Sequence, residues 1–69
     1  MNNKEVILKE LKSCSRISNI RILLEHFISP TNLHRIILSL QEEGYMIAHI
    51  NHMNKEYCLI QDKNGVFYN

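Results

Sequence analysis

The sequence predicts a single α+β domain in which three helices are followed by a β-hairpin. A chain of 69 residues has the length of one small domain, and residues 1–69 contain no internal repeat or linker. Apolar residues recur at helical spacing as far as Gly44. Beyond Gly44, two apolar-rich runs surround a short polar stretch, a pattern typical of two paired strands.

The first helix is expected from about residue 3 to residue 13. Asn2 or Asn3 can cap it, and Asn2 with Glu5 has the spacing of a capping box. One face of this helix is apolar and consists of Ile7, Leu8, Leu11 and Cys14.

The second helix is expected to begin after Ser18, which is a suitable N-cap. Ile17 and Ile22 then have the spacing of a hydrophobic staple across the helix start. The helix should end near Phe27, because residues just before a proline are disfavoured in helical conformation. The stripe expected to face the core consists of Ile20, Leu23, Leu24 and Phe27.

The third helix, over about residues 30–43, has the clearest start. Ser29 is the expected N-cap, and Pro30 takes the first helical position, where its missing N–H costs nothing. Ile28 and Leu33 form a second staple, and Gly44 is placed to end the helix in a left-handed conformation. Its buried stripe is expected to be Leu33, Ile36, Ile37 and Leu40.

The hairpin is expected to pair residues 45–50 with residues 56–61 around the polar stretch 51–55. A turn centred on Met53 sets Ile47 opposite Leu59 and His49 opposite Tyr57. A second turn signal, Asp62–Lys63–Asn64–Gly65, leaves room for a short third strand made of Val66, Phe67 and Tyr68.

Two helices joined by a tight turn, then a hairpin, follow the plan of a winged helix-turn-helix. The run NIRILLEHFISPTNLHRIILSLQEEGYMI resembles the helix-turn-helix of winged-helix bacterial regulators of the IclR and MarR types. YCLI is similar to their returning wing strand, so the resemblance covers roughly residues 5–61. It implies a winged-helix fold and a contact with DNA. Two departures are Phe27, where these families often have glycine, and the lack of an effector domain after the hairpin.

The resemblance implies that the third helix inserts its N-terminal end into the major groove. Arg35 can contact guanine through two hydrogen bonds, and Asn32 can contact adenine in the same way. Ser29, Thr31 and the helix N-terminus suit a phosphate, and His34 lies on the same polar side. A solvated helix face in a protein-binding domain is the alternative interpretation.

Further DNA contacts are expected from the wing tip and from the start of the second helix. His52, Asn54 and Lys55 lie in the wing at 51–55, which would touch the minor groove or the backbone. Arg16 and Arg21 flank the start of the second helix, where phosphates would run. Each set can equally be ordinary solvated surface.

The charge distribution weakens a DNA-binding interpretation without excluding it. The net charge is only +1, whereas nucleic-acid binders usually have a stronger basic footprint. We therefore keep a second hypothesis, in which the domain is a protein–protein interaction module that acts as an adaptor or inhibitor of a transcription component.

Catalytic and metal-binding functions find little support in the sequence. There is no glycine-rich phosphate loop and no nucleophile motif, so we expect neither an enzyme nor a cofactor. His49, His52 and Cys58 could be considered as metal ligands, but residues three apart on a strand point to opposite faces. We expect no metal site, and we expect Cys14 to be a core residue.

The expected function is that of a small transcriptional regulator, a repressor, that binds double-stranded DNA as a homodimer in the cytoplasm. Helix-turn-helix proteins usually gain affinity by dimerising on two half-sites. Apolar residues outside the three stripes could form the dimer contact or complete a monomeric core; they are Val6, Ile22, Leu38, Val66, Phe67 and Tyr68. No segment predicts a membrane span, and two cysteines are too few for a disulfide scaffold.

Overall fold

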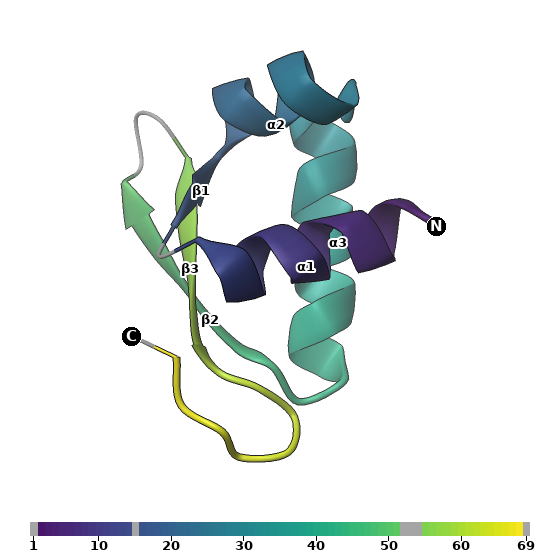
Figure 1. Cartoon of the computed structure of the whole chain (residues 1–69). Helices are drawn as coiled ribbons and strands as arrows, with labels where there is room; N and C mark the ends of the chain where they lie inside the picture. Colours follow the sequence, from purple (N-terminus) through teal and green to yellow (C-terminus); the bar gives the residue numbers. More distant parts are fainter. Residues whose placement is uncertain (1, 15, 52–54, 69) are drawn as a thin grey trace.

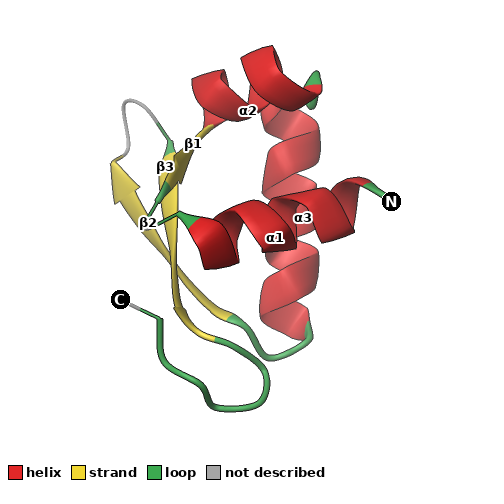
Figure 2. Cartoon of the chain, viewed as in Figure 1, coloured by secondary structure: helices red, strands yellow, loops and turns green. Residues whose placement is uncertain are grey.

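A three-stranded antiparallel sheet lies on one side of the domain and three helices on the other (Figures 1 and 2). The computed structural model describes residues 2–14, 16–51 and 55–68. The elements are α1 (Asn3–Ser13), β1 (Ile17–Ser18), α2 (Asn19–His26), α3 (Pro30–Glu42), β2 (Met46–Asn51) and β3 (Glu56–Gln61). The α+β class is confirmed, and the arrangement is compatible with a winged-helix-like domain.

The hairpin has the register that the sequence predicts. Ile47 pairs with Leu59 and His49 pairs with Tyr57, with irregularities in the ladder on either side of these pairs. The centre of the predicted turn, residues 52–54, lies outside the described residues. β3 is the central strand, because β1 pairs along its other edge through Ile17 and Tyr57. A two-residue strand has no periodicity, so β1 has no signal in the sequence pattern.

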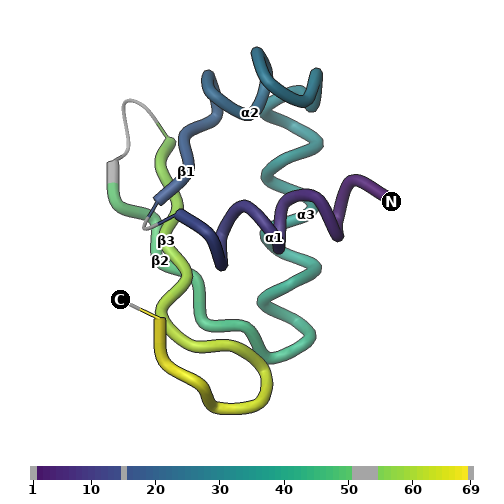
Figure 3. The backbone as a smooth tube through the Cα atoms, in the orientation of Figure 1, coloured from purple at the N-terminus to yellow at the C-terminus, as the bar shows by residue number. Residues whose placement is uncertain are grey.

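The C-terminal segment turns back along β3 beneath the hairpin (Figure 3). Its predicted third strand is reduced to one bridge between Gln61 and Phe67. Asp62 organises this turn, since its carboxylate accepts hydrogen bonds from the Asn64 and Val66 N–H groups and from the Tyr68 hydroxyl. These bonds, the one from Val66 above all, hold the pKa of the Asp62 carboxyl below its usual value.

Side-chain caps begin all three helices as predicted. The Asn2 Oδ1 atom accepts from the Glu5 N–H at 2.8 Å. Ser18 and Ser29 cap α2 and α3 through Oγ, each at 3.2 Å from the N–H three residues later. Gly44 follows the last turn of α3 with a φ of 111°, a conformation that favours glycine.

The core forms where α1, α3 and β3 meet, with both predicted staples fully buried inside it. Its apolar side chains come from every element: Ile7, Leu11, Ile17, Ile22, Ile28, Leu33, Ile37, Leu40, Tyr45, Ile47, Tyr57 and Leu59. Leu8, Cys14, Ile36 and Tyr68 are partly buried against it. The stripes predicted for α1 and α3 are therefore confirmed.

The stripe predicted for α2 is wrong. Ile20, Leu23, Leu24 and Phe27 are exposed, whereas Ile22 is completely buried, so Ile22 also cannot form a dimer contact. α2 has only eight residues and packs on the domain through the face that carries Ile22. Helical periodicity identifies an apolar stripe, but it does not show on which side of a short helix the rest of the chain lies.

Phe27 has the left-handed conformation that glycine usually supplies at such a turn. Its φ and ψ are 58° and 33°, and its N–H still donates to the Leu23 carbonyl at 3.0 Å. This conformation costs an L-residue about 1–2 kcal/mol. A phenylalanine in place of glycine at this position therefore adds backbone strain to the turn. The helix α2 itself ends at His26, close to the predicted end.

Candidate nucleic-acid interface

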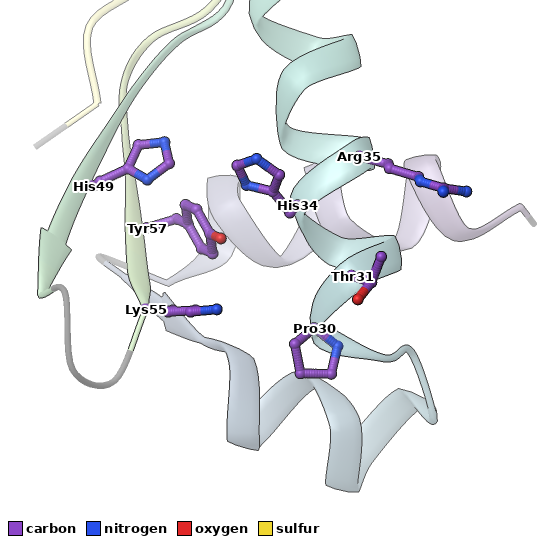
Figure 4. Close-up of a pocket in the computed structure, with 7 residues that line it drawn as sticks. All are labelled: Pro30, Thr31, His34, Arg35, His49, Lys55 and Tyr57. Carbon is purple, nitrogen blue, oxygen red and sulfur yellow. The ribbon is translucent and has the colours of Figure 1, made fainter.

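A groove of about 390 Å³ lies between the N-terminal half of α3 and the hairpin (Figure 4). Its lining comes from two elements that are separated in sequence: Pro30, Thr31, His34 and Arg35 from α3, and His49, Lys55 and Tyr57 from the hairpin. Four of these seven residues are among those that the sequence predicts to contact DNA, namely Thr31, His34, Arg35 and Lys55.

The α3 side of the groove follows from helical spacing. Thr31, His34 and Arg35 are three and four residues apart, so they share one exposed face. The opposite face buries Leu33 and Ile37, which fixes the rotation of the helix against the core. The helix α3 begins beside the groove, because its N-cap is directly followed by Pro30, which lines the groove. The N-terminal end of a helix favours anions.

The hairpin side carries an aromatic pair beside a lysine. The His49 and Tyr57 rings meet edge to face with their centroids 4.9 Å apart, and the His34 ring lies 6.2 Å from that of His49. Burial raises the pKa of the Tyr57 phenol above its usual value of 10.0. Lys55 is exposed at the start of the returning segment, with a φ of 48°.

The groove has the electrostatic character of an anion site. Lys55 supplies positive charge from the hairpin and points toward α3, whereas the Arg35 side chain extends from α3 away from the hairpin (Figure 4). Thr31 and the two histidines supply hydrogen-bonding groups. Among the described residues that line the groove, none is aspartate or glutamate. A phosphate group could be reached from α3 and from the hairpin together.

The remaining predicted site residues lie elsewhere. Ser29 uses its hydroxyl to cap α3, and Asn32 is exposed but does not line the groove. His52 and Asn54 lie outside the described residues. The Arg16 guanidinium pairs with Glu56 at 3.6 Å.

The other arginine at the start of α2 is held by two carboxylates. Arg21 Nε lies 2.6 Å from Glu25, and its Nη2 atom lies 3.9 Å from Glu10. The Glu25 carboxylate, through its hydrogen bond first and then its charge, raises the pKa of Arg21. Both arginines thus enter ion pairs within the chain, and neither belongs to the groove lining.

Three lining residues are not among those that the sequence predicts, namely Pro30, His49 and Tyr57. The sequence did contain a signal for two of them, because the predicted register already paired His49 with Tyr57. The packing of the N-terminal half of α3 beside that pair could not be predicted from the sequence. The groove exists only once the helix and the hairpin are set side by side.

A second polar cluster joins α1 to α2. Ligand atoms of Glu10, Glu25 and His26 lie within 4.8 Å of one another, the one such group among the residues that the structure describes. Arg21 binds both carboxylates, and His26 Nε2 lies 3.2 Å from Glu10. A guanidinium therefore already supplies the positive charge, and we assign the cluster to an ion-pair network.

Comparison of the chain with protein-family models, with curated proteins and with solved structures gives no match. Within residues 2–14, 16–51 and 55–68, no helix has the length and apolar character needed to cross a bilayer.

Proposed function

We propose that this chain is a winged helix-turn-helix regulator that binds duplex DNA through α3 and the hairpin. The order of elements supports the proposal, because α2 and α3 are joined by a tight turn and the hairpin follows directly. The resemblance of residues 19–47 to winged-helix bacterial regulators supports it from the sequence. In this proposal α3 is the recognition helix, and residues 51–55 are the tip of the wing.

The observation that carries the proposal is the groove lined by α3 and the hairpin, whose described lining residues include no aspartate or glutamate. Arg35 is on the exposed face of the recognition helix, where its guanidinium can bind guanine O6 and N7. Thr31 and Lys55 suit phosphate oxygens on either side of that contact. Asn32 lies one residue beyond Thr31 and can reach an adenine edge from outside the groove.

A domain of this size regulates most simply by occupying its site. We therefore propose a repressor that blocks a promoter when it is bound. Because the net charge is only +1, affinity has to come from local contacts at the groove rather than from a basic surface over the whole domain.

A salt titration tests the proposal. A fluorescent random-sequence duplex is titrated with the protein at several salt concentrations between about 50 and 200 mM, and binding is followed by anisotropy. We expect binding at low salt and a fall in affinity of roughly tenfold or more across that range, since phosphate contacts release counterions. Absence of binding at the lowest salt would contradict DNA binding.

That negative result would favour a second function, a protein-binding winged helix that acts on a transcription component. The near-neutral charge and the internal pairing of Arg16 and Arg21 favour this alternative. Selection of bound sequences from a random duplex pool separates the two functions further, because only a base-reading domain enriches a defined sequence.

A further inference from the structure

The outer face of α2 carries an apolar stripe that neither the core nor the groove explains. It consists of Ile20, Leu23, Leu24 and Phe27, with exposed fractions of 61, 40, 70 and 87%. We call it the α2 stripe. None of these four residues lines the groove, and the buried residue of α2, Ile22, lies on the opposite face of the helix.

The α2 stripe is large for a domain of this size. Complete burial of these four side chains in two copies of the chain would remove on the order of 1,000 Å² from water, the lower limit for a specific interface. Soluble monomers rarely expose a contiguous apolar patch without an interaction to cover it. Phe27 makes the exposed stripe more unfavourable for a monomer, because its apolar ring is exposed to water and its backbone has a strained left-handed conformation.

Charges beside the α2 stripe indicate what covers it. Arg21 and Glu25, which pair with each other within the chain, run along one edge of the stripe and flank its centre between Leu23 and Leu24. When two such helices pack antiparallel about a two-fold axis, the same edge of each helix meets. Arg21 of one copy then lies opposite Glu25 of the other, twice over.

A parallel packing lacks this complementarity. It would set the Arg21–Glu25 edge against the opposite edge of the second helix, which carries Asn19 and His26. No arginine–carboxylate pair forms between the copies in that arrangement. The charges therefore select the antiparallel, two-fold packing.

We infer that a second copy of this chain docks on the α2 stripe, with the two α2 helices antiparallel. Leu23 and Leu24 meet their counterparts at the centre, and Ile20 of each copy lies against Phe27 of the other. Arg21 and Glu25 exchange partners across the edge. This inference concerns the free protein, so it can fail or hold independently of DNA binding.

Sedimentation velocity of the free protein, over about 1–200 µM, measures the association. With an interface of this size we expect a dimer with a dissociation constant in the micromolar range. Leu24→Glu places a charge in the stripe and should weaken association at least tenfold. Met46→Glu makes the same change at an exposed apolar residue of β2 and should leave it unchanged.

A charge exchange tests the antiparallel geometry. Arg21→Glu leaves two acidic residues on the edge and Glu25→Arg leaves two basic ones, so each variant alone should associate weakly. Mixed together, the two variants should form a heterodimer close to wild-type strength, because both cross-pairs are restored. A role of these residues within one chain cannot produce this rescue, and circular dichroism checks that each variant is folded.

A wild-type protein that stays monomeric at the highest concentration would overturn the inference. So would a dimer that Met46→Glu disrupts and Leu24→Glu does not, since the contact would then lie on the sheet. Failure of the mixture to associate, when both variants are folded, would overturn the antiparallel packing.

Discussion

His49 of β2 lies directly opposite Tyr57 of β3, and their rings meet edge to face with centroids 4.9 Å apart. His49 also faces His34 of α3, with 6.2 Å between the ring centroids. A row of three rings thus connects the returning strand, the outer strand and the helix. This row holds the hairpin beside the N-terminal half of α3 and defines one wall of the groove (Figure 4).

Replacing His49 by alanine removes the middle ring of this row. We expect the free energy of unfolding to fall by about 0.5–1 kcal/mol, the usual contribution of a cross-strand aromatic pair. His49→Phe retains a ring and should recover most of that loss. Urea denaturation of the three proteins measures the difference, and equal stability of the alanine variant and the wild type would show that the ring contacts contribute nothing.

The turn between α2 and α3 should prefer glycine over alanine at position 27. Both substitutions remove the phenyl ring, but alanine keeps the Cβ atom that is disfavoured at a φ of 58°. Phe27→Gly should therefore be more stable than Phe27→Ala by about 1 kcal/mol, the reverse of their order within a helix. Thermal or urea denaturation gives the order, and a more stable alanine variant would argue against strain at Phe27.

Arg35 should contribute more to DNA affinity than Arg16. Arg35→Ala is expected to weaken binding to the selected duplex by about 1–3 kcal/mol, because Arg35 is the residue proposed to read a base. Arg16→Ala removes the same charge, but that arginine pairs with Glu56 and does not line the groove. Anisotropy titrations compare the two variants, and a larger loss from Arg16→Ala would place the DNA contact elsewhere.

Lys55 should affect the salt dependence of binding rather than its sequence preference. Lys55→Asn removes the charge with a residue that tolerates the positive φ at this position. The slope of log affinity against log salt should fall by about 1, the value expected for one lost phosphate contact.

Lys63 provides the matched control for Lys55. It is exposed and lies beside Gly44, at the opposite end of α3 from the groove. Lys63→Asn should leave the salt dependence unchanged. An equal effect of both variants would mean that only overall charge matters.

The turn around Asp62 should make the free energy of unfolding depend on pH in the acid range. Hydrogen bonds to the carboxylate lower its folded pKa below the usual 3.8. Its stabilising contribution is therefore present above that value and is lost as the pH falls through the folded pKa. Asp62→Asn should be less stable than the wild type at pH 7, and the gap should close below about pH 3.8. Denaturation across this range measures it, and a gap that stays constant would contradict the role of the charge.

Local signals in the sequence were sufficient to predict most of the elements. The serine caps, the proline at the start of α3 and the Ile17–Ile22 and Ile28–Leu33 staples act over a few residues, and all of them occur as predicted. The hairpin register was predicted from alternation together with a turn centred on Met53, and the Ile47–Leu59 pair occurs as predicted.

Features that depend on distant parts of the chain were not predictable in this way. β1 is two residues long and exists only because β3 offers it an edge. The face that α2 buries depends on where the core lies, so the stripe of Ile20, Leu23, Leu24 and Phe27 was placed on the wrong side. Most of the α3 side of the groove was predicted from the sequence. His49 and Tyr57 join it only through tertiary packing, so that part of the hairpin wall was not predicted.

The central proposal is that DNA binds in the groove between α3 and the hairpin. Its most direct test is nuclear magnetic resonance of the ¹⁵N-labelled protein titrated with duplex DNA at low salt. We expect the largest amide shifts to gather at Thr31, His34, Arg35, His49, Lys55 and Tyr57, with α1 and Lys63 little changed. A spectrum without shifts, or one whose shifts gather away from this groove, would contradict the proposal.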